Sequence, residues 1–135
     1  MAASSAVSGY GSILDRITTP VPEVRSLTGP GASRDSIEVT HLSSDSAWKE
    51  FIAGMKDGGT VQATINWLSS NATHVQLAAD FASGSTIAWP IDPAGVSADV
   101  ISFSAFVMNF EVSFTTSDAA TLTLTLKITG PVTYA

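Results

Sequence analysis

The chain has 135 residues, of which 44% are hydrophobic and 13% are charged, a composition typical of one folded domain rather than a disordered chain. Its formal net charge of −6 comes from six basic and twelve acidic residues, which argues against a wholesale binder of duplex DNA because such a protein needs a cationic surface. The absence of cysteine excludes disulfides, thiolate metal sites and a cysteine nucleophile.

Residues 1–20 are expected to form an N-terminal arm. They lack the basic start and the unbroken apolar run of a signal peptide. Ile13, Leu14 and Ile17 give the arm enough apolar content to dock on a neighbour or to add an edge strand. Pro20 closes it as a linker or a protected edge, since proline lacks a backbone donor. No apolar run in the chain approaches the roughly 18 residues that cross a bilayer, so we expect no membrane anchor.

The segment after this arm is predicted to alternate strands and turns. Residues 23–27 are a short strand candidate, and residues 36–40 alternate apolar and polar side chains with the period of a half-buried strand. Between them, Gly29, Pro30 and Gly31 are predicted to reverse the chain, because glycine accepts positive φ and proline fixes φ at about −65°.

Residues 41–59 are predicted to leave the sheet as a loop that carries a short helix. Four large apolar residues follow at i, i+3, i+4 and i+7, a spacing that places them on one helical face: Trp48, Phe51, Ile52 and Met55. We call these four residues the apolar cluster. Asp45 or Ser46 is expected to cap the helix, and the glycines at positions 58 and 59 are expected to end it.

The apolar cluster has two interpretations, and periodicity leaves both open. Its side chains pack on the domain's own core, which we expect for half of them, or they anchor another subunit, since aromatic and methionine residues are enriched at such anchors. Charges of both signs flank the cluster as the rim of an interface would. The candidate subunit-interface residues are Trp48, Lys49, Glu50, Phe51, Met55, Lys56, Asp57, Arg25 and Arg34.

A strand and a helix are predicted next. Residues 60–68 alternate strictly, with one apolar face that contains Val61, Ala63, Ile65 and Trp67. Asn71 or Thr73 is expected to cap a helix over residues 74–82, and Gly84 is expected to end it. Its apolar stripe contains Leu77, Ala78 and Phe81.

The remaining elements are predicted to be strands. Residues 85–91 align Ile87, Trp89 and Ile91, with prolines that indicate an edge or an early end. Residues 100–115 are the longest apolar segment, and a slip in alternation at Ala105 and Phe106 indicates a bulge or a strong twist.

The last strand is predicted over residues 121–129, with leucine and isoleucine on one face and threonine and lysine on the other. Gly130 and Pro131 are expected to end it. The fold class is therefore α+β, mainly β: an antiparallel β-sandwich or half-barrel with one helix packed on it, formed by residues 21–135 as a single domain.

No constellation for catalysis or metal binding emerges. His41 and His74 lie far apart in sequence without further ligands at helical or hairpin spacing, so each is interpreted as a surface or boundary histidine. Asp35 and Glu38 point to opposite faces of a strand and make a poor acid–base pair. The glycines do not match a phosphate-binding loop. We expect no metal, no cofactor and no enzymatic activity.

An ordered set of motifs resembles the tail tube (major tail) proteins of long-tailed bacteriophages. It consists of a Gly-Pro turn at Gly29 and Pro30, an Asp-x-Ile-Glu-Val-Thr strand at residues 35–40, and a Glu-Phe-Ile-x-Gly-Met-Lys-Asp-Gly-Gly segment at residues 50–59. The similarity continues in later segments and covers roughly residues 21–132. Those segments are Thr73 and His74, Leu77 and Phe81, residues 103–107 and residues 126–132.

The resemblance implies a structural virion protein with the fold of tail tubes and type VI secretion tubes. Such proteins form homohexameric rings that stack around a tape-measure protein into a hollow tube, with tail terminator and distal tail proteins as further partners. The loop at about residues 41–59 and the terminal arms would link the rings. The implied location is the virion tail, with assembly in the host cytoplasm.

DNA would pass through the lumen of such a tube without specific binding. Six copies, each with a net charge of −6, would give a negative bore that repels phosphate.

Two other functions are open from the sequence. A sugar-binding or adhesive β-sandwich on a virion or cell surface would use Trp67 and Trp89 as stacking platforms. An enzyme ranks third, because no acid and base are paired.

Overall fold

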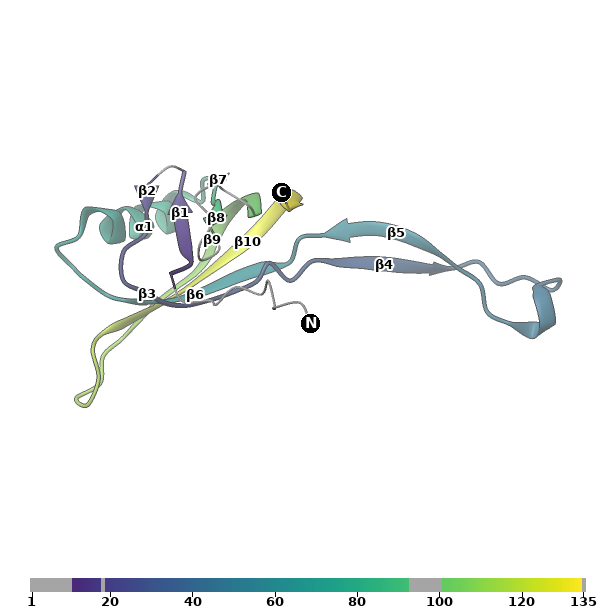
Figure 1. Cartoon of the computed structure of the whole chain (residues 1–135), viewed down its shortest axis with the longest axis horizontal. Helices are drawn as coiled ribbons and strands as arrows, with labels where there is room; N and C mark the ends of the chain where they lie inside the picture. The colour runs from purple at the N-terminus through teal and green to yellow at the C-terminus, as the bar shows by residue number, and fades with distance from the viewer. Residues whose placement is uncertain (1–10, 18, 93–100, 135) are drawn as a thin grey trace, which may run out of the picture.

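The computed structural model describes residues 11–17, 19–92 and 101–134, and within these residues one antiparallel sheet forms the body of the molecule (Figure 1). The elements in chain order are β1 (Ile13–Arg16), β2 (Thr19–Pro20), β3 (Val24–Thr28), β4 (Ser33–Glu38), the 3₁₀ turn η1 (Asp45–Ala47), β5 (Phe51–Asp57), β6 (Thr60–Asn66), α1 (Ala72–Ser83), β7 (Ile87–Ala88), β8 (Ile91–Asp92), β9 (Ile101–Ser113) and β10 (Thr121–Tyr134).

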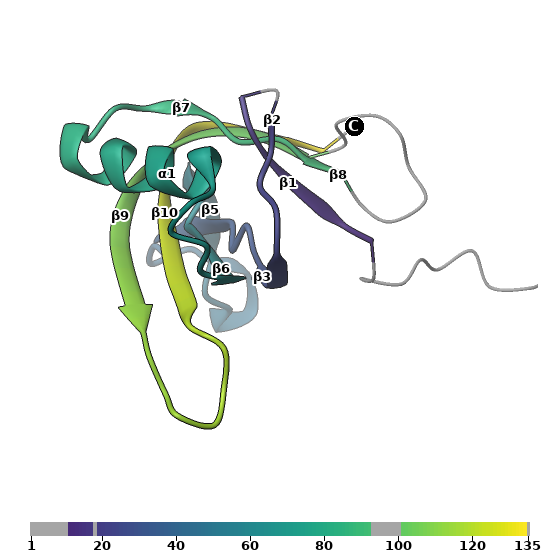
Figure 2. The same cartoon turned by 90° about the vertical axis from the view of Figure 1, so that its left-hand side faces the viewer.

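The sheet has the strand order β2-β1-β8-β9-β10-β6-β3, with β7 also paired to β9, and helix α1 packs against β9 (Figure 2). Strands β4 and β5 form a separate hairpin that projects away from the body. The described sheet is open, with β2 and β3 at its ends. This architecture confirms an α+β, mainly antiparallel β fold with one packed helix.

The core follows from strict alternation in the two central strands. On β10 the buried residues are Leu122, Leu124, Leu126 and Ile128, and on β6 they are Val61, Ala63 and Ile65. Because successive side chains of a strand point to opposite faces, one face of the sheet is apolar and is covered by α1 and by the strands near the N-terminus. Trp89 is fully buried in this core, where its Nε1–H donates to the carbonyl oxygen of Ala105 at 3.2 Å.

Helix α1 begins and ends where the sequence predicts. The side chain of Asn71 accepts hydrogen bonds from the backbone N–H groups of Thr73 and His74, at 3.0 and 3.2 Å. Gly84 ends the helix in the left-handed conformation at φ 66°, which glycine adopts without steric cost. Leu77 is buried beneath the helix, and Phe81 stacks on Phe110 with ring centroids 6.3 Å apart.

His74 is fully buried, so its interpretation as a surface or boundary residue is wrong. The backbone N–H of Leu68 donates to its Nδ1 at 3.0 Å, which leaves Nε2 as the protonated nitrogen that donates to the carbonyl oxygen of Pro22 at 2.9 Å. The ring also stacks on Trp67, with centroids 5.8 Å apart. His74 therefore joins the start of α1 to two loops. His41, in contrast, is exposed.

Residues 13–16 add a strand to the sheet, which is one of the two outcomes expected for the N-terminal arm. Strand β1 pairs with β8, and Leu14 is fully buried. Arg16 forms a bidentate ion pair with the buried Asp80 of α1, at 2.6 and 2.8 Å, and this hydrogen bonding raises the pKa of Arg16 above its ordinary value. Residues 1–10 of the predicted arm lie outside the described residues.

Two strand details differ from the sequence predictions. The slip in β9 lies at Met108 rather than at Ala105 and Phe106, because Met108 is the extra residue between the partners of Thr125 and Leu126. Strand β10 does not end at Gly130. It resumes pairing with β9 at Thr133, since an irregularity absorbs the proline that cannot donate to the ladder.

The Gly29–Gly31 segment does not reverse the chain, so that prediction is wrong. β3 and β6 are paired up to Thr28 and Gln62, and pairing resumes at Ser33 and Asp57 in β4 and β5. The chain therefore continues outward from β3 into β4 and returns through β5 into β6 (Figure 1). The glycines serve close approach at this junction, because a Cβ on Gly59 would lie 2.3 Å from the carbonyl oxygen of Gly31.

Candidate subunit-interaction surfaces

The projecting β4–β5 hairpin (residues 33–57) has no residue in the buried core. Its two strands pair only with each other, with Ile37 opposite Ile52 and Glu38 opposite Phe51. Its tip, residues 41–50, contains the 3₁₀ turn and lies at the far end from the body (Figure 1). An isolated two-stranded ribbon is only marginally stable in water, so this hairpin is expected to have a partner along its length.

The apolar cluster lies on this hairpin and not on a helix, which corrects the sequence prediction. Phe51, Ile52 and Met55 belong to β5, while Trp48 follows the 3₁₀ turn. All four side chains are exposed, Trp48 by 74% and Met55 by 83%, so the expectation that half of them pack in the chain's own core is also wrong. Three further large apolar residues of the hairpin are exposed: Ile37, Val39 and Leu42.

Cross-strand pairing explains why a strand forms where the spacing predicts a helix. Val39 N–H donates to the carbonyl oxygen of Glu50 at 2.8 Å, and Glu50 N–H donates to Oγ1 of Thr40 at 2.9 Å, which starts the return strand. Gly54 is unfavourable inside a helix. In the hairpin it permits close packing, since a Cβ there would lie 3.1 Å from the Cβ of Asp35. This glycine argues against the predicted helix, although it does not by itself indicate a strand.

The structure divides the predicted charged interface residues between the two ends of the hairpin. Near the tip, Glu50 is 3.3 Å from Nε2 of His41 and accepts a hydrogen bond from Ser44, while Lys49 is exposed beside Trp48. At the root, Asp57 accepts from Gly59 N–H at 2.9 Å and from Lys127 at 3.3 Å.

These two contacts at the root, the Gly59 N–H first, hold the pKa of Asp57 below its usual range. The two predicted arginines lie apart from each other. Arg34 of β4 is near the root, opposite Lys56 of β5, and donates to the carbonyl oxygen of Gly54 at 3.4 Å. Arg25 lies outside the hairpin and is exposed on β3, an edge strand of the sheet.

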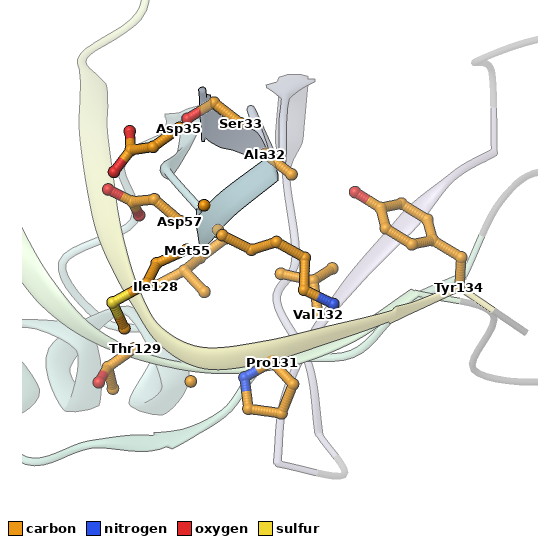
Figure 3. Close-up of a pocket in the computed structure, with 14 residues that line it drawn as sticks. Ala32, Ser33, Asp35, Met55, Asp57, Ile128, Thr129, Pro131, Val132 and Tyr134 are labelled. Atoms are coloured by element: carbon orange, nitrogen blue, oxygen red, sulfur yellow. The ribbon is translucent and has the colours of Figure 1, made fainter. Parts of the chain in front are cut away.

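A groove of about 970 Å³ lies between the root of the hairpin and the end of β10 (Figure 3). Its apolar lining comes mainly from β10 and includes Ile128, Pro131, Val132 and Tyr134, with Met55 from β5. Asp35 and Asp57 lie on one wall with their carboxylates near one another, opposite the ring of Tyr134 (Figure 3). Sequence reasoning missed this groove because it joins residues 32–35 and 54–58 to residues 128–134, which lie far apart in the chain.

The face of the sheet opposite the core is polar and nearly uncharged. Its residues follow from pairing and alternation across β3, β6, β10 and β9. Along β10 from Lys127 to Thr121, the successive rows are Thr60, Lys127 and Phe106; Thr28, Gln62, Thr125 and Asn109; Ser26, Thr64, Thr123 and Glu111; and Asn66, Thr121 and Ser113. In these rows, Glu111 and Lys127 are the charged side chains, and two further carboxylates lie at their edge: Asn66 donates to Glu23 at 3.2 Å and Lys127 donates to Asp57 at 3.3 Å. We call this surface the open face.

Both sides of this four-stranded region end in strand edges that lack a partner among the described residues. β3 pairs with β6 on one side only, and β9 pairs with β7 and β8 only at residues 101–105, so its outer edge over residues 106–113 has no paired strand. Unpaired edges of this length are sites where another chain adds its own strand.

Neither a metal site nor a membrane-spanning helix is found in the described part of the chain. The described residues contain no group of three or more histidines, cysteines or acidic residues placed to hold a metal ion. None of the helices among them has the length and apolarity to span a bilayer.

Comparison with solved structures finds the same fold in tube-forming assemblies. A chain of the tail of an empty gene transfer agent particle, solved with C6 symmetry, has a TM-score of 0.79 at 13% identity over 96% of this chain and 99% of that chain. A chain of the sheath/tube terminator of an extracellular contractile injection system has a TM-score of 0.75 at 15% identity, with 97% of each chain covered. The SPP1 tail tube protein has a TM-score of 0.64 at 12% identity, covering 92% and 76%.

Comparison with curated proteins gives no match. The family model of the lambda phage tail tube protein matches residues 7–135, which is nearly the whole chain. That match agrees with the motif order in the sequence and with the fold of the tube structures. The chain therefore belongs to the phage tail tube protein family and is a structural protein of the virion tail.

Proposed function

We propose that six copies of this chain form a ring, that the rings stack into the hollow tube of a phage tail, and that DNA passes through the bore. The observation that carries this proposal is the incompleteness of the isolated chain. It leaves the edges of β3 and β9 without partners among the described residues and exposes the apolar side chains of the β4–β5 hairpin. Other copies of the same chain supply a partner strand for each unpaired edge and cover the exposed apolar side chains.

Within a ring, the edge of β3 of one copy pairs with the outer edge of β9 of the next. This is a head-to-tail contact, which closes into a ring when the rotation between neighbours divides a full turn. Each copy contributes β9, β10, β6 and β3, so six copies give a barrel of about 24 strands. Barrels of roughly 16 to 18 strands already leave an aqueous channel, so this barrel has an open bore. The C6 symmetry of the gene transfer agent tail supports the ring number.

The open face lines this bore in our proposal. Its threonine, serine, asparagine and glutamine side chains present neither a cationic surface that would bind phosphate nor an apolar surface that would hold a passing protein. The charged groups on or beside this face are Glu111, Lys127 and the carboxylates of Glu23 and Asp57, so the net negative bore expected from the sequence stays a prediction. DNA then passes without specific binding because no row of basic residues releases its counterions.

Between rings, the β4–β5 hairpin makes the axial contact, and it includes most of the loop at residues 41–59 expected for that role. The interface residues proposed from the sequence lie on it or, in the case of Arg25, on the edge used within the ring. A tape-measure protein in the bore and terminator and distal tail proteins at the two ends complete the assembly. The capped tube of the anti-feeding prophage, whose terminating cap has the same fold, supports terminator contacts.

The sugar-binding alternative loses the two tryptophans on which it was based. Trp89 is fully buried and Trp67 is half-buried between His74 and Phe110, so neither presents a free ring on which a sugar would stack. We propose that the chain has no catalytic role, in keeping with a family of structural tail proteins.

Electron microscopy of the purified chain at increasing concentration, alone and co-expressed with a tape-measure protein, tests the proposal. We expect hollow tubes with six-fold symmetry in end views. Compact monomers under all of these conditions would contradict the proposal. Tubes of another symmetry would contradict the ring number of six but would support the formation of a tube.

A further inference from the structure

The tip and the root of the β4–β5 hairpin are complementary in chemistry. The tip exposes two large apolar side chains, Trp48 and Leu42, with Lys49 beside the tryptophan. The root groove has an apolar floor on β10 and a charged wall that contains the carboxylates of Asp35 and Asp57 and the cation of Lys56 (Figure 3). An exposed aromatic anchor on one surface matches an apolar groove on the other in polarity, and the carboxylate of Asp35 on the groove wall offers a partner to the cation beside the anchor.

The two surfaces cannot meet within one molecule. They lie at opposite ends of the hairpin, with the full length of β4 and β5 between them (Figure 1). Each copy therefore offers one tip and one groove to different neighbours. A contact between two different surfaces of identical copies is head-to-tail, and it propagates along an axis when the rotation and shift between copies do not close a ring, which is the geometry that a stack requires.

The groove is large enough for the tip. Its volume of about 970 Å³ exceeds what a single aromatic side chain fills, so it accommodates Trp48 together with Leu42. Lys49 has no ion-pair or hydrogen-bond partner among the described residues, and Asp35 has none either, so each is available to a partner. Asp57 is already bonded to Lys127 and Gly59.

We propose that the root groove is the receptor for the hairpin tip of a second copy, with Trp48 and Leu42 seated against Ile128, Val132 and Tyr134 and with Lys49 paired to Asp35. This inference rests on the proposed tube function and names the axial contact within it. It assigns a binding site to the end of β10, a strand otherwise explained by its place in the core.

Cysteine cross-linking tests the contact directly, because the chain has no cysteine of its own. The variant that carries both Trp48→Cys and Val132→Cys is assembled into tubes and oxidised. We expect a ladder of disulfide-linked multimers in non-reducing gels. Each single variant should give at most a dimer, and a matched pair in which Trp48→Cys is combined with Ser85→Cys, an exposed site away from the groove, should give no ladder.

A charge exchange gives a second readout that does not depend on oxidation. Lys49→Asp and Asp35→Lys should each raise the concentration needed for tube formation by about tenfold or more, and the double variant should restore most of the loss. Asp118→Lys, in the turn between β9 and β10 at the other side of the molecule, changes the charge equally and should have no such effect.

The outcomes separate this inference from the tube function. If the unmodified chain forms tubes but the cysteine pair gives no ladder and the charge exchange gives no rescue, the receptor assignment is wrong and the tube stands. If Val132→Cys instead cross-links to a cysteine placed within residues 1–10 of a neighbour, a terminal segment occupies the groove and the proposal is overturned. If the unmodified chain forms no tubes under any condition, both proposals fail.

Discussion

The imidazole of His74 holds the start of helix α1 against the loops on either side of it. It accepts from Leu68 N–H and donates to the carbonyl oxygen of Pro22 while its ring stacks on Trp67. The side chain of His74 is fully buried, and the two backbone groups that it contacts lie in a part-buried site. A buried donor or acceptor without a partner costs about 1–3 kcal/mol, so the ring is needed for its nitrogens as much as for its volume.

Replacing His74 by phenylalanine keeps most of the volume and removes both hydrogen bonds. We expect the free energy of unfolding to fall by about 2–4 kcal/mol, measured by urea denaturation of the monomer. Val75→Ala is the matched control, since Val75 is the next residue of α1 and is exposed, and it should change stability by less than about 0.5 kcal/mol. A His74→Phe variant as stable as the unmodified chain would show that the two contacts contribute nothing.

Asp57 predicts a pH dependence at the root of the hairpin. Gly59 N–H and Lys127 stabilise its charged form, so its folded-state pKa is lower than the value of about 3.9 expected in the unfolded chain. The stabilisation is fully present above that unfolded value and is lost as the pH falls through the lower, folded value. We expect a carboxyl ¹³C titration midpoint below the usual aspartate range, moving upward in Lys127→Gln. An unchanged midpoint in that variant would exclude a role for the lysine.

At the scale of single elements, burial decides how much the sequence predicts. Strand β6 and helix α1 were predicted correctly because each has one buried and one solvent-exposed side. The alternation of apolar and polar residues indicates the two faces of β6, and the Asn71 cap indicates the start of α1. The β4–β5 hairpin has no buried side. The helical spacing of its apolar cluster therefore carried no information about packing, and the wrong element was predicted.

The candidate surfaces were predictable to a different extent. The sequence placed Trp48, Phe51 and Met55 at an interface as one of two interpretations, and their exposure agrees with that interpretation. The root groove depends on Asp35 and Val132 lying near each other, which only the tertiary arrangement provides. The open face was visible as a polar alternation in residues 60–66, but its extent across four strands needed the register.

The exposed apolar side chains of the hairpin predict an assembly defect without a folding defect. Phe51→Asp and Met55→Asp should leave the thermal unfolding of the monomer within about 3 °C of the unmodified chain, because neither residue is in the core. Tube formation should be lost or shifted to much higher concentration, measured by sedimentation and electron microscopy. Val75→Asp replaces an exposed valine outside the hairpin and should assemble normally. If melting collapses while the folded fraction still polymerises, the residues stabilise the monomer instead.

At the scale of the whole molecule, the body and the hairpin are separable. The buried core contains residues from β1, β6, α1, β9 and β10 but none from residues 33–57. The hairpin touches the body mainly at its root, where Gly58 packs so closely on Ile128 that a Cβ would lie 2.5 Å from its Cγ2. The buried core is thus independent of the hairpin, the element that we propose makes the contact between rings.

Deleting residues 33–57, so that Ala32 is joined to Gly58, tests this separation. We expect the shortened chain to fold, with a melting temperature lowered by less than about 10 °C, because only the partial cover of Ile128 and Val132 is lost. Rings should still form through the sheet edges, and electron microscopy should show isolated or disordered rings in place of tubes. A chain that does not fold, or one that still forms long tubes, would contradict this expectation.

The division between a self-sufficient core and an outlying hairpin lets the specificity of stacking change without any change of fold. Two versions of this chain, one with exchanged charges at Lys49 and Asp35 and one without, would share every core residue and both ring-forming edges. Mixed together, they would still enter the same rings, while the contact between unlike tips and grooves would be weakened by like charges.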